Sequence, residues 1–356
     1  MSDAALQACL IGAGSFGAHA LEALARSELV RLVGVSDRDR RLAEAASGNV
    51  CGAYDDHRRA LVETAPQAVF LAVPPAPAAE LARLAAQRGI HVWRQVPLAR
   101  NLPEAVELCR RMDRADRQFV VGTERRYRHS YRHARTLRER LGRIYMVRGH
   151  YEFNQGPDLA WRGDKDAGGG ALIELGYHML DLIIWLMGMP GSILAVTGTG
   201  QRAAGEADLP VYDSDDSAVI VMRYPHQAVA VVNVTRCFNP LREGLTLYGE
   251  AGTIAASAGE CIFRDRHGAV VDTLTDDETP AGLFGRMIDD FARTALANAP
   301  RYACSGWESL RTLACVEAAY LSDRTGACED PHDLLAGYDL TEADCLKTAP
   351  KEEPAP

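Results

Sequence analysis

Two groups of residues in this chain have the types and spacing for chemistry. In the first, Gly12, Gly14 and Gly17 follow a short apolar run and open a helical pattern. The first glycine of such a segment makes a tight turn, the second lets a pyrophosphate approach the backbone, and the third lets the helix pack against the strand. The helix N-terminus offers free N–H groups to phosphates. The predicted nucleotide contacts of this loop are Gly12, Ala13, Gly14, Ser15, Phe16 and Gly17.

An acidic residue stands where a ribose would lie. Asp37 follows the next predicted strand, about 20 residues after the glycines. A carboxylate there accepts hydrogen bonds from the adenosine ribose, which favours NAD. Arg38 beside it would suit adenine stacking or a 2′-phosphate, so NADP stays open. The alternative is a glycine turn and a surface aspartate that bind nothing.

The second group is a helix that carries His178, Glu174 and Asp181. Residues four apart share a helical face, so Glu174 and His178 are expected to point the same way. Histidine suits proton transfer because its ordinary pKa of roughly 6.5 lies near working pH. We therefore expect His178 to be the acid or base and Glu174 to orient it or raise its pKa. The alternatives are a core histidine, a carboxylate paired with an arginine, and a structural role for Asp181.

Alternating strands and helices are expected to position these residues. Short apolar runs alternate with helical patterns up to about residue 122, which predicts a doubly wound parallel sheet, a Rossmann fold. Strand-like runs with turn residues dominate later, so the second part is predicted to be α+β with an open, largely antiparallel sheet. We expect a nucleotide-binding domain at 1–125, a substrate and oligomerisation domain at 126–345, and a disordered tail at 346–356.

Composition limits the partners. The 356 residues carry a net charge of −9, which disfavours nucleic acid or an anionic membrane as a partner. No apolar run reaches the roughly 18 residues of a membrane span, and no secretion signal is apparent, so a cytoplasmic protein is expected. The nine cysteines include no CxxC pair, which predicts reduced thiols and no metal site.

Several segments, in order, resemble the glucose–fructose oxidoreductase / inositol dehydrogenase / rhizopine-catabolism (Gfo/Idh/MocA) family. Beyond the glycine fingerprint, these segments are Leu71-Ala72-Val73-Pro74-Pro75, Gly89-Ile90-His91-Val92, Trp161-Arg162, the run from Gly168 to Asp181, and Tyr248–Thr253. The resemblance implies hydride transfer with sugars, cyclitols or related small molecules, using NAD or NADP. It also implies nucleotide contacts from Val73, Pro74, Pro75 and Gln95, and substrate contacts from Trp161 and Arg162.

The chain departs from the family pattern at a position expected to take part in catalysis. The resemblance implies Glu-Lys-Pro where this chain has Gln95-Val96-Pro97, and valine can neither hydrogen-bond a hydroxyl nor stabilise an alkoxide. Two residues are candidates for the missing positive charge. Arg94 lies two positions before Val96 on the same predicted strand face. Lys165 lies in the loop before the motif helix. Surface charge is the alternative for both.

Further candidates follow the predicted strand Gln118–Gly122. Arg125, Arg126 and Tyr127 are expected either to line the pocket or to form an exposed helix start. Arginine there would suit a substrate carboxylate or phosphate through bidentate pairing.

The main expectation is an NAD(P)-dependent oxidoreductase with a non-standard active site. The alternatives are a reductase of an imine or similar electrophile, a catalytically inactive dinucleotide-binding regulatory or scaffold protein, and a lyase or glycosidase that cycles its cofactor. The resemblance also implies a homodimer or homotetramer.

Overall fold

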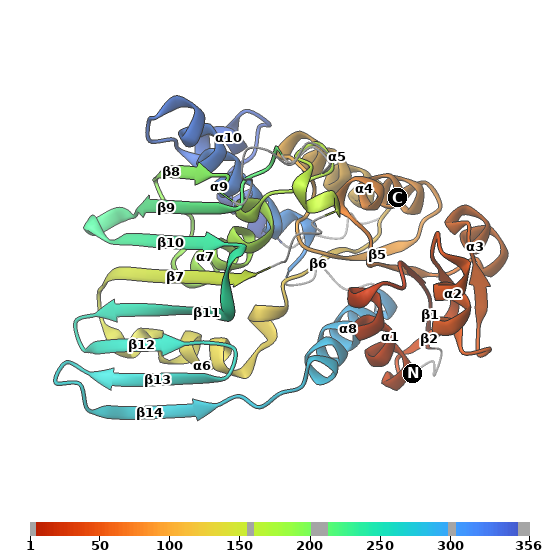
Figure 1. The fold of residues 1–356 in the computed structure, drawn as a ribbon, viewed down its shortest axis with the longest axis horizontal. Helices are drawn as coiled ribbons and strands as arrows, with labels where there is room; N and C mark the ends of the chain where they lie inside the picture. Colours follow the sequence, from red (N-terminus) through yellow and green to blue (C-terminus); the bar gives the residue numbers. More distant parts are fainter. Residues whose placement is uncertain (1–4, 155–159, 201–212, 298–303, 348–356) are drawn as a thin grey trace, which may run out of the picture.

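The computed structural model describes residues 5–154, 160–200, 213–297 and 304–347, and within them the chain forms two β-sheets joined by helices (Figure 1). The strands are β1 Leu6–Ile11, β2 Val30–Ser36, β3 Gly52–Tyr54, β4 Ala68–Leu71, β5 His91–Gln95, β6 Phe119–Gly122, β7 Ile144–Asn154, β8 Ser192–Gly198, β9 Ser217–Arg223, β10 Val229–Thr235, β11 Cys237–Gly249, β12 Gly252–Ala256, β13 Glu260–Asp265 and β14 Val270–Thr275. The α-helices are α1 Ser15–Arg26, α2 Arg40–Ser47, α3 His57–Thr64, α4 Pro75–Gln87, α5 Leu102–Arg114, α6 His129–Leu137, α7 Tyr177–Met187, α8 Pro280–Leu296, α9 Gly306–Thr325, α10 Pro331–Ala336 and α11 Glu342–Leu346.

The first sheet is parallel, in the order β3-β2-β1-β4-β5-β6. Strands β1 (LQACLI) and β4 (AVFL) at its centre are almost wholly apolar, because helices cover both faces of a parallel sheet. The predicted Rossmann fold is confirmed. Strand β3 and helix α3 were not anticipated, since both are short and carry little apolar pattern.

Register brings the carboxyl ends of these strands to one edge. Ile11, the last residue of β1, pairs with Ser36 of β2 and Leu71 of β4. The segments that follow β1, β2, β4, β5 and β6 therefore emerge side by side. In open parallel sheets, ligands bind at this edge.

The second sheet has the order β14-β13-β12-β11-β7-β10-β9-β8 and is antiparallel except between β7 and β10. The expectation of an α+β part with a largely antiparallel sheet is confirmed. Helix α7 contacts β7, α6 contacts β12 and β13, and α9 contacts β8. These helices lie behind the sheet in Figure 1 and cover that face.

The last helices return to the first sheet. Helix α8 contacts α1, and α9 contacts both α5 and α7. Val120 of β6 forms an isolated bridge with Ser305, at the start of α9. The C-terminal helices thus hold the two sheets against each other.

The predicted boundaries at 125 and 345 stay predictions. Of the tail predicted from residue 346, Leu346 ends α11, and residues 348–356 lie outside the described residues.

Candidate active site

The glycine-rich loop follows β1 and opens α1 as the sequence predicts. Gly12 has φ of +96°, and a Cβ there would lie 2.4 Å from the carbonyl oxygen of Ala72. A Cβ on Gly17 would lie 2.1 Å from the carbonyl oxygen of Gly12. These two glycines are required by the fold itself.

Gly14 has a different reason to be glycine. A Cβ there would meet nothing within 4 Å, so the protein leaves open space beside it. It is the N-cap of α1, and no side chain caps that end of the helix. The uncapped N-terminus offers N–H groups and a positive dipole end to an anion. The loop therefore fits the pyrophosphate of a dinucleotide.

Asp37 lies against the same loop. One carboxylate oxygen accepts the Ala13 N–H at 2.7 Å, and the other accepts the Asp39 N–H at 2.9 Å. The side chain is half-buried, and Arg38 beside it is exposed. This placement, at the end of β2 next to the glycines, fits a ribose-binding carboxylate.

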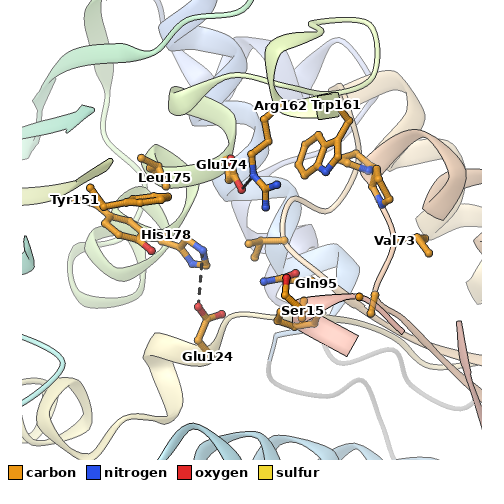
Figure 2. A pocket seen from close by; sticks show the side chains of 17 residues that line it. Ser15, Val73, Gln95, Glu124, Tyr151, Trp161, Arg162, Glu174, Leu175 and His178 are labelled. Carbon is orange, nitrogen blue, oxygen red and sulfur yellow. Dashed lines mark hydrogen bonds and ion pairs between the residues drawn. The ribbon is translucent and has the colours of Figure 1, made fainter. Parts of the chain in front are cut away.

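A cavity of about 340 Å³ opens at the carboxyl edge of the parallel sheet, within the size range of small-molecule sites. Seventeen residues from both parts of the chain line it (Figure 2). They are Gly14, Ser15, Phe16, Ala72, Val73, Pro74, Pro75, Gln95, Val96, Glu124, Tyr151, Phe153, Trp161, Arg162, Glu174, Leu175 and His178. The nucleotide loop and the helix of His178 therefore face one space.

Glu174 lies in a π-helical turn, Leu172–Gly176, that leads into α7. Its oxygens pair with Arg162 Nε at 2.7 Å and with Arg236 at 2.6 Å. Glu174 lines the cavity with His178 as expected, but its carboxylate is engaged by these arginines. The structure thus corresponds to the alternative of a carboxylate paired with arginine. No described contact joins Glu174 to His178.

His178 is buried in the first turn of α7, beside the ring of Tyr151. Burial, followed by the nearby Arg125 guanidinium, holds the pKa of His178 well below its ordinary value of 6.5. The expected rise in its pKa from Glu174 is therefore wrong. The acidic side chain that does lie near it is Glu124, whose Oε1 is 3.8 Å from His178 Nε2 (Figure 2).

Arg94 lies outside the cavity lining, whereas Gln95 and Val96 line it. Strand β5 ends at Gln95, so the alternation that would place Arg94 and Val96 on one side does not extend to Val96. The Arg94 side chain is buried, and burial lowers its pKa to about 10, opposed by Glu104 and Tyr177. Arg94 therefore does not supply the missing positive charge to this cavity.

Five other candidates for catalysis or substrate binding also lie outside the lining, and one of them, Arg126, is buried. Lys165 is exposed, with its ammonium 5.7 Å from the ring of Tyr320. Asp181 is buried and makes two short contacts with Arg126, at 2.6 and 2.7 Å, which corresponds to its structural alternative. Tyr127 is buried in the apolar core around α8. Arg125 is buried rather than exposed, paired with Glu124 and Glu243.

Sequence reasoning missed Glu124, Tyr151 and Arg236 as members of the site. Glu124 follows β6 directly, and that position at a strand's carboxyl end was the available signal. Tyr151 comes from β7, and Arg236 from the corner between β10 and β11, so only the fold brings them here. Among the described residues, no three His, Cys, Asp or Glu side chains are placed to hold a metal ion.

Comparison with known proteins identifies the class. Residues 6–123 match the sequence model of an oxidoreductase family's NAD-binding Rossmann fold, and residues 135–329 match the C-terminal alpha/beta domain of the same family. The chain belongs to this family, Gfo/Idh/MocA, and is an NAD(P)-dependent oxidoreductase. The resemblance seen in the sequence is confirmed.

Its relatives include sugar dehydrogenases. The chain is 22% identical over 330 residues to D-xylose 1-dehydrogenase (NADP(+)) 2 of Haloferax volcanii, covering 89% of this chain and 97% of the relative. It is 30% identical over 240 residues to D-glucoside 3-dehydrogenase of Escherichia coli, covering 61% of this chain and 66% of the relative. The solved structure of levoglucosan dehydrogenase with NADH and levoglucosan superposes with a TM-score of 0.83 at 22% identity, covering 92% and 99% of the two chains.

No helix among the described residues is long and apolar enough to cross a membrane.

Proposed function

We propose that this protein transfers hydride between NAD and a sugar, cyclitol or related small molecule in the cavity shared by the glycine-rich loop and His178. The observation that carries the proposal is that Ser15 and Phe16 of the nucleotide loop line the same space as His178 and Glu174. NAD is favoured over NADP by Asp37, because a carboxylate accepts ribose hydroxyls and repels a 2′-phosphate. The bound nicotinamide would accept or supply the hydride.

The nicotinamide would carry the hydride, so a protein side chain must accept or donate the proton of the substrate hydroxyl. Because burial keeps His178 neutral at neutral pH, a ring nitrogen can accept the proton of a substrate hydroxyl as the C–H hydride leaves. The carboxylate of Glu124, 3.8 Å from Nε2, would stabilise the imidazolium that forms. Glu174 would hold Arg162 over the cavity, and Trp161 stacks under that guanidinium at 4.7 Å. Trp161 and Arg162 are thus proposed substrate contacts.

The test combines nucleotide binding with turnover. NADH and NADPH are titrated by fluorescence, and levoglucosan, D-xylose and myo-inositol are screened at the nicotinamide absorbance band. His178→Ala is expected to lower turnover about 100-fold or more while leaving NADH affinity within about twofold, because proton transfer contributes on that scale. His267→Ala, at an exposed position, is the control. Failure to bind either nucleotide would contradict the proposal.

A second candidate is reduction of an imine or similar electrophile. It is favoured by Val96, which lines the cavity where the family resemblance implies lysine. A C=N substrate forms no alkoxide, so it has less need of a positive charge at that point. Turnover with cyclic imines and none with polyols would select this candidate, whereas NADH binding without any turnover would indicate a regulatory or scaffold role.

A further inference from the structure

Glu124 differs from the other carboxylate of the cavity in how its oxygens are satisfied. Both oxygens of Glu174 are paired with arginine. Glu124 Oε1 accepts Arg125 at 2.8 Å and lies near His178, but Glu124 Oε2 is buried with no hydrogen-bond partner among the described residues. A buried acceptor without a donor costs free energy, about 1–3 kcal/mol and more for a charged group. A ligand that donates to this oxygen would remove that cost.

The guanidinium of Arg125 pairs with two carboxylates, those of Glu124 and Glu243. Arg125 pairs with Glu243 through its Nε at 2.8 Å and one terminal nitrogen, and it meets Glu124 through the other terminal nitrogen. Tyr131 also approaches Glu243, at 3.4 Å. One guanidinium therefore serves two buried or half-buried carboxylates, which leaves Glu124 less than fully neutralised.

Among the described residues that line the cavity, no arginine or lysine lies at this end. His178 is held neutral by burial, and Val96 is uncharged. Arg162 lies on the other side of the cavity, bound to Glu174, as Figure 2 shows. The end of the cavity near Glu124 is thus electrostatically suited to a cation, and the end near Arg162 is not.

We infer that the substrate of this enzyme carries a protonated amino group, bound by Glu124, so that the substrate class is an aminated sugar or cyclitol. An ammonium is the donor that best matches a partly neutralised carboxylate, because charge-assisted hydrogen bonds are the strong ones. The terminal torsion of glutamate is soft, so the carboxylate can turn Oε2 toward the ligand. This inference rests on the proposed function, since it describes the occupant of the same cavity.

The test compares three hexoses of different charge. D-glucosamine, D-glucose and D-glucuronate are titrated into the protein–NADH complex by calorimetry, below the pKa of the glucosamine amine. The expected result is that glucosamine binds about tenfold more tightly than glucose, and glucuronate most weakly. Glu124→Gln should reduce the glucosamine preference to about twofold or less, and Glu124→Lys should reverse the order. Glu250→Gln, an exposed carboxylate paired with Arg143, is the control.

Each outcome decides the question. The comparison in the unaltered protein needs no variant, and NADH affinity reports whether each variant has folded. Equal binding of the three sugars, binding of none, or tightest binding of glucuronate would overturn the inference. These results would leave the proposed function standing, because that function is tested separately by nucleotide binding and by the loss of turnover in His178→Ala.

Discussion

Asp37 has observed contacts within the protein and one proposed contact with the nucleotide. Its carboxylate accepts the Ala13 N–H and so holds the glycine-rich loop, and it lies where an adenosine ribose is expected. Asparagine would keep an acceptor oxygen for the loop but lose the charge. The substitution therefore separates the structural task from the selection of the nucleotide.

Asp37→Asn is expected to weaken NADH binding about tenfold, the scale of a hydrogen bond to a charged group, and to weaken NADPH binding less. The measurement is fluorescence titration with both nucleotides. Asp39→Asn is the matched control, because Asp39 is a neighbouring carboxylate that caps α2 through the Arg41 N–H at 2.9 Å. An unchanged NADH to NADPH ratio in Asp37→Asn would contradict the assigned preference.

At the scale of an element, the turn from β1 into α1 contains one glycine that the fold requires and one whose proposed role is nucleotide binding. A methyl group at Gly17 would strike the backbone of Gly12, but a methyl group at Gly14 would enter open space. The backbone of Gly14, with φ of −68° and ψ of −167°, is accessible to alanine. The two glycines thus form a matched pair of sites for substitution.

Gly14→Ala is expected to change the free energy of unfolding by about 1 kcal/mol or less, the cost of an N-cap change, yet to weaken NADH binding at least tenfold. Gly17→Ala is expected to destabilise the protein by several kcal/mol, because backbone must move. Denaturant unfolding and NADH titration measure the two effects. Comparable stability losses in both variants would refute the distinction.

Strand β5 carries a histidine whose charge is linked to folding. His91 is buried, and its Nδ1 accepts the Gln118 N–H at 2.9 Å. Burial, and then the charge of Arg117, lowers the pKa of His91 from 6.5 to about 4. Between these pH values the unfolded chain binds a proton at His91 that the folded chain does not. The contribution of His91 to the free energy of unfolding is therefore fully present above pH 6.5 and is lost as the pH falls toward 4.

His91→Asn keeps an acceptor near the position of Nδ1 and removes the titration. The free energy of unfolding of this variant should therefore fall less steeply with decreasing pH between about 6.5 and 4 than that of the unaltered protein, by about 1.4 kcal/mol per pH unit. Denaturant unfolding at a series of pH values gives both slopes. Parallel slopes would show that His91 titrates alike in both states.

For the whole molecule, one face of the second sheet carries an exposed apolar patch. Leu194 and Val196 of β8 are exposed and pair in register with the exposed Val221 and Val219 of β9. The covering helices lie on the opposite face (Figure 1). Clustered exposed apolar side chains are typical of protein–protein interaction sites. It supports the expectation of a homodimer or homotetramer formed through the open sheet.

If this face is the proposed interface, Val219→Glu is expected to shift the protein toward the monomer, because the variant would bury a charge there. Sedimentation velocity over a range of concentrations measures the change. Val62→Glu, at an exposed valine on α3, is the control and should leave the assembly unchanged. A monomeric unaltered protein would refute the oligomer itself.

Local pattern was enough to predict the parallel sheet, the glycine-rich loop and the position of Asp37. Those features follow from the periodicity of apolar residues along short segments. They also follow from the general rule that the carboxyl ends of parallel strands lie at one edge of the sheet. The same reasoning missed β13, β14 and α6. Strand β14 lies at the edge of the sheet with no fully buried residue, β13 buries only Cys261 and Phe263, and the buried face of α6 includes the polar Ser130.

The sequence by itself determined that a nucleotide loop and a helix with His178 exist. Only the tertiary structure decided that Glu124 lies beside that histidine, that Arg236 and Arg162 hold Glu174, and that Arg94 is buried away from the cavity. The physical reason is that charged side chains far apart in sequence choose partners by register and packing, which no local spacing encodes. Helical spacing correctly predicted that Glu174 and His178 face the same cavity. The arginines that the fold brings next to Glu174 determined that its carboxylate forms ion pairs instead of contacting His178.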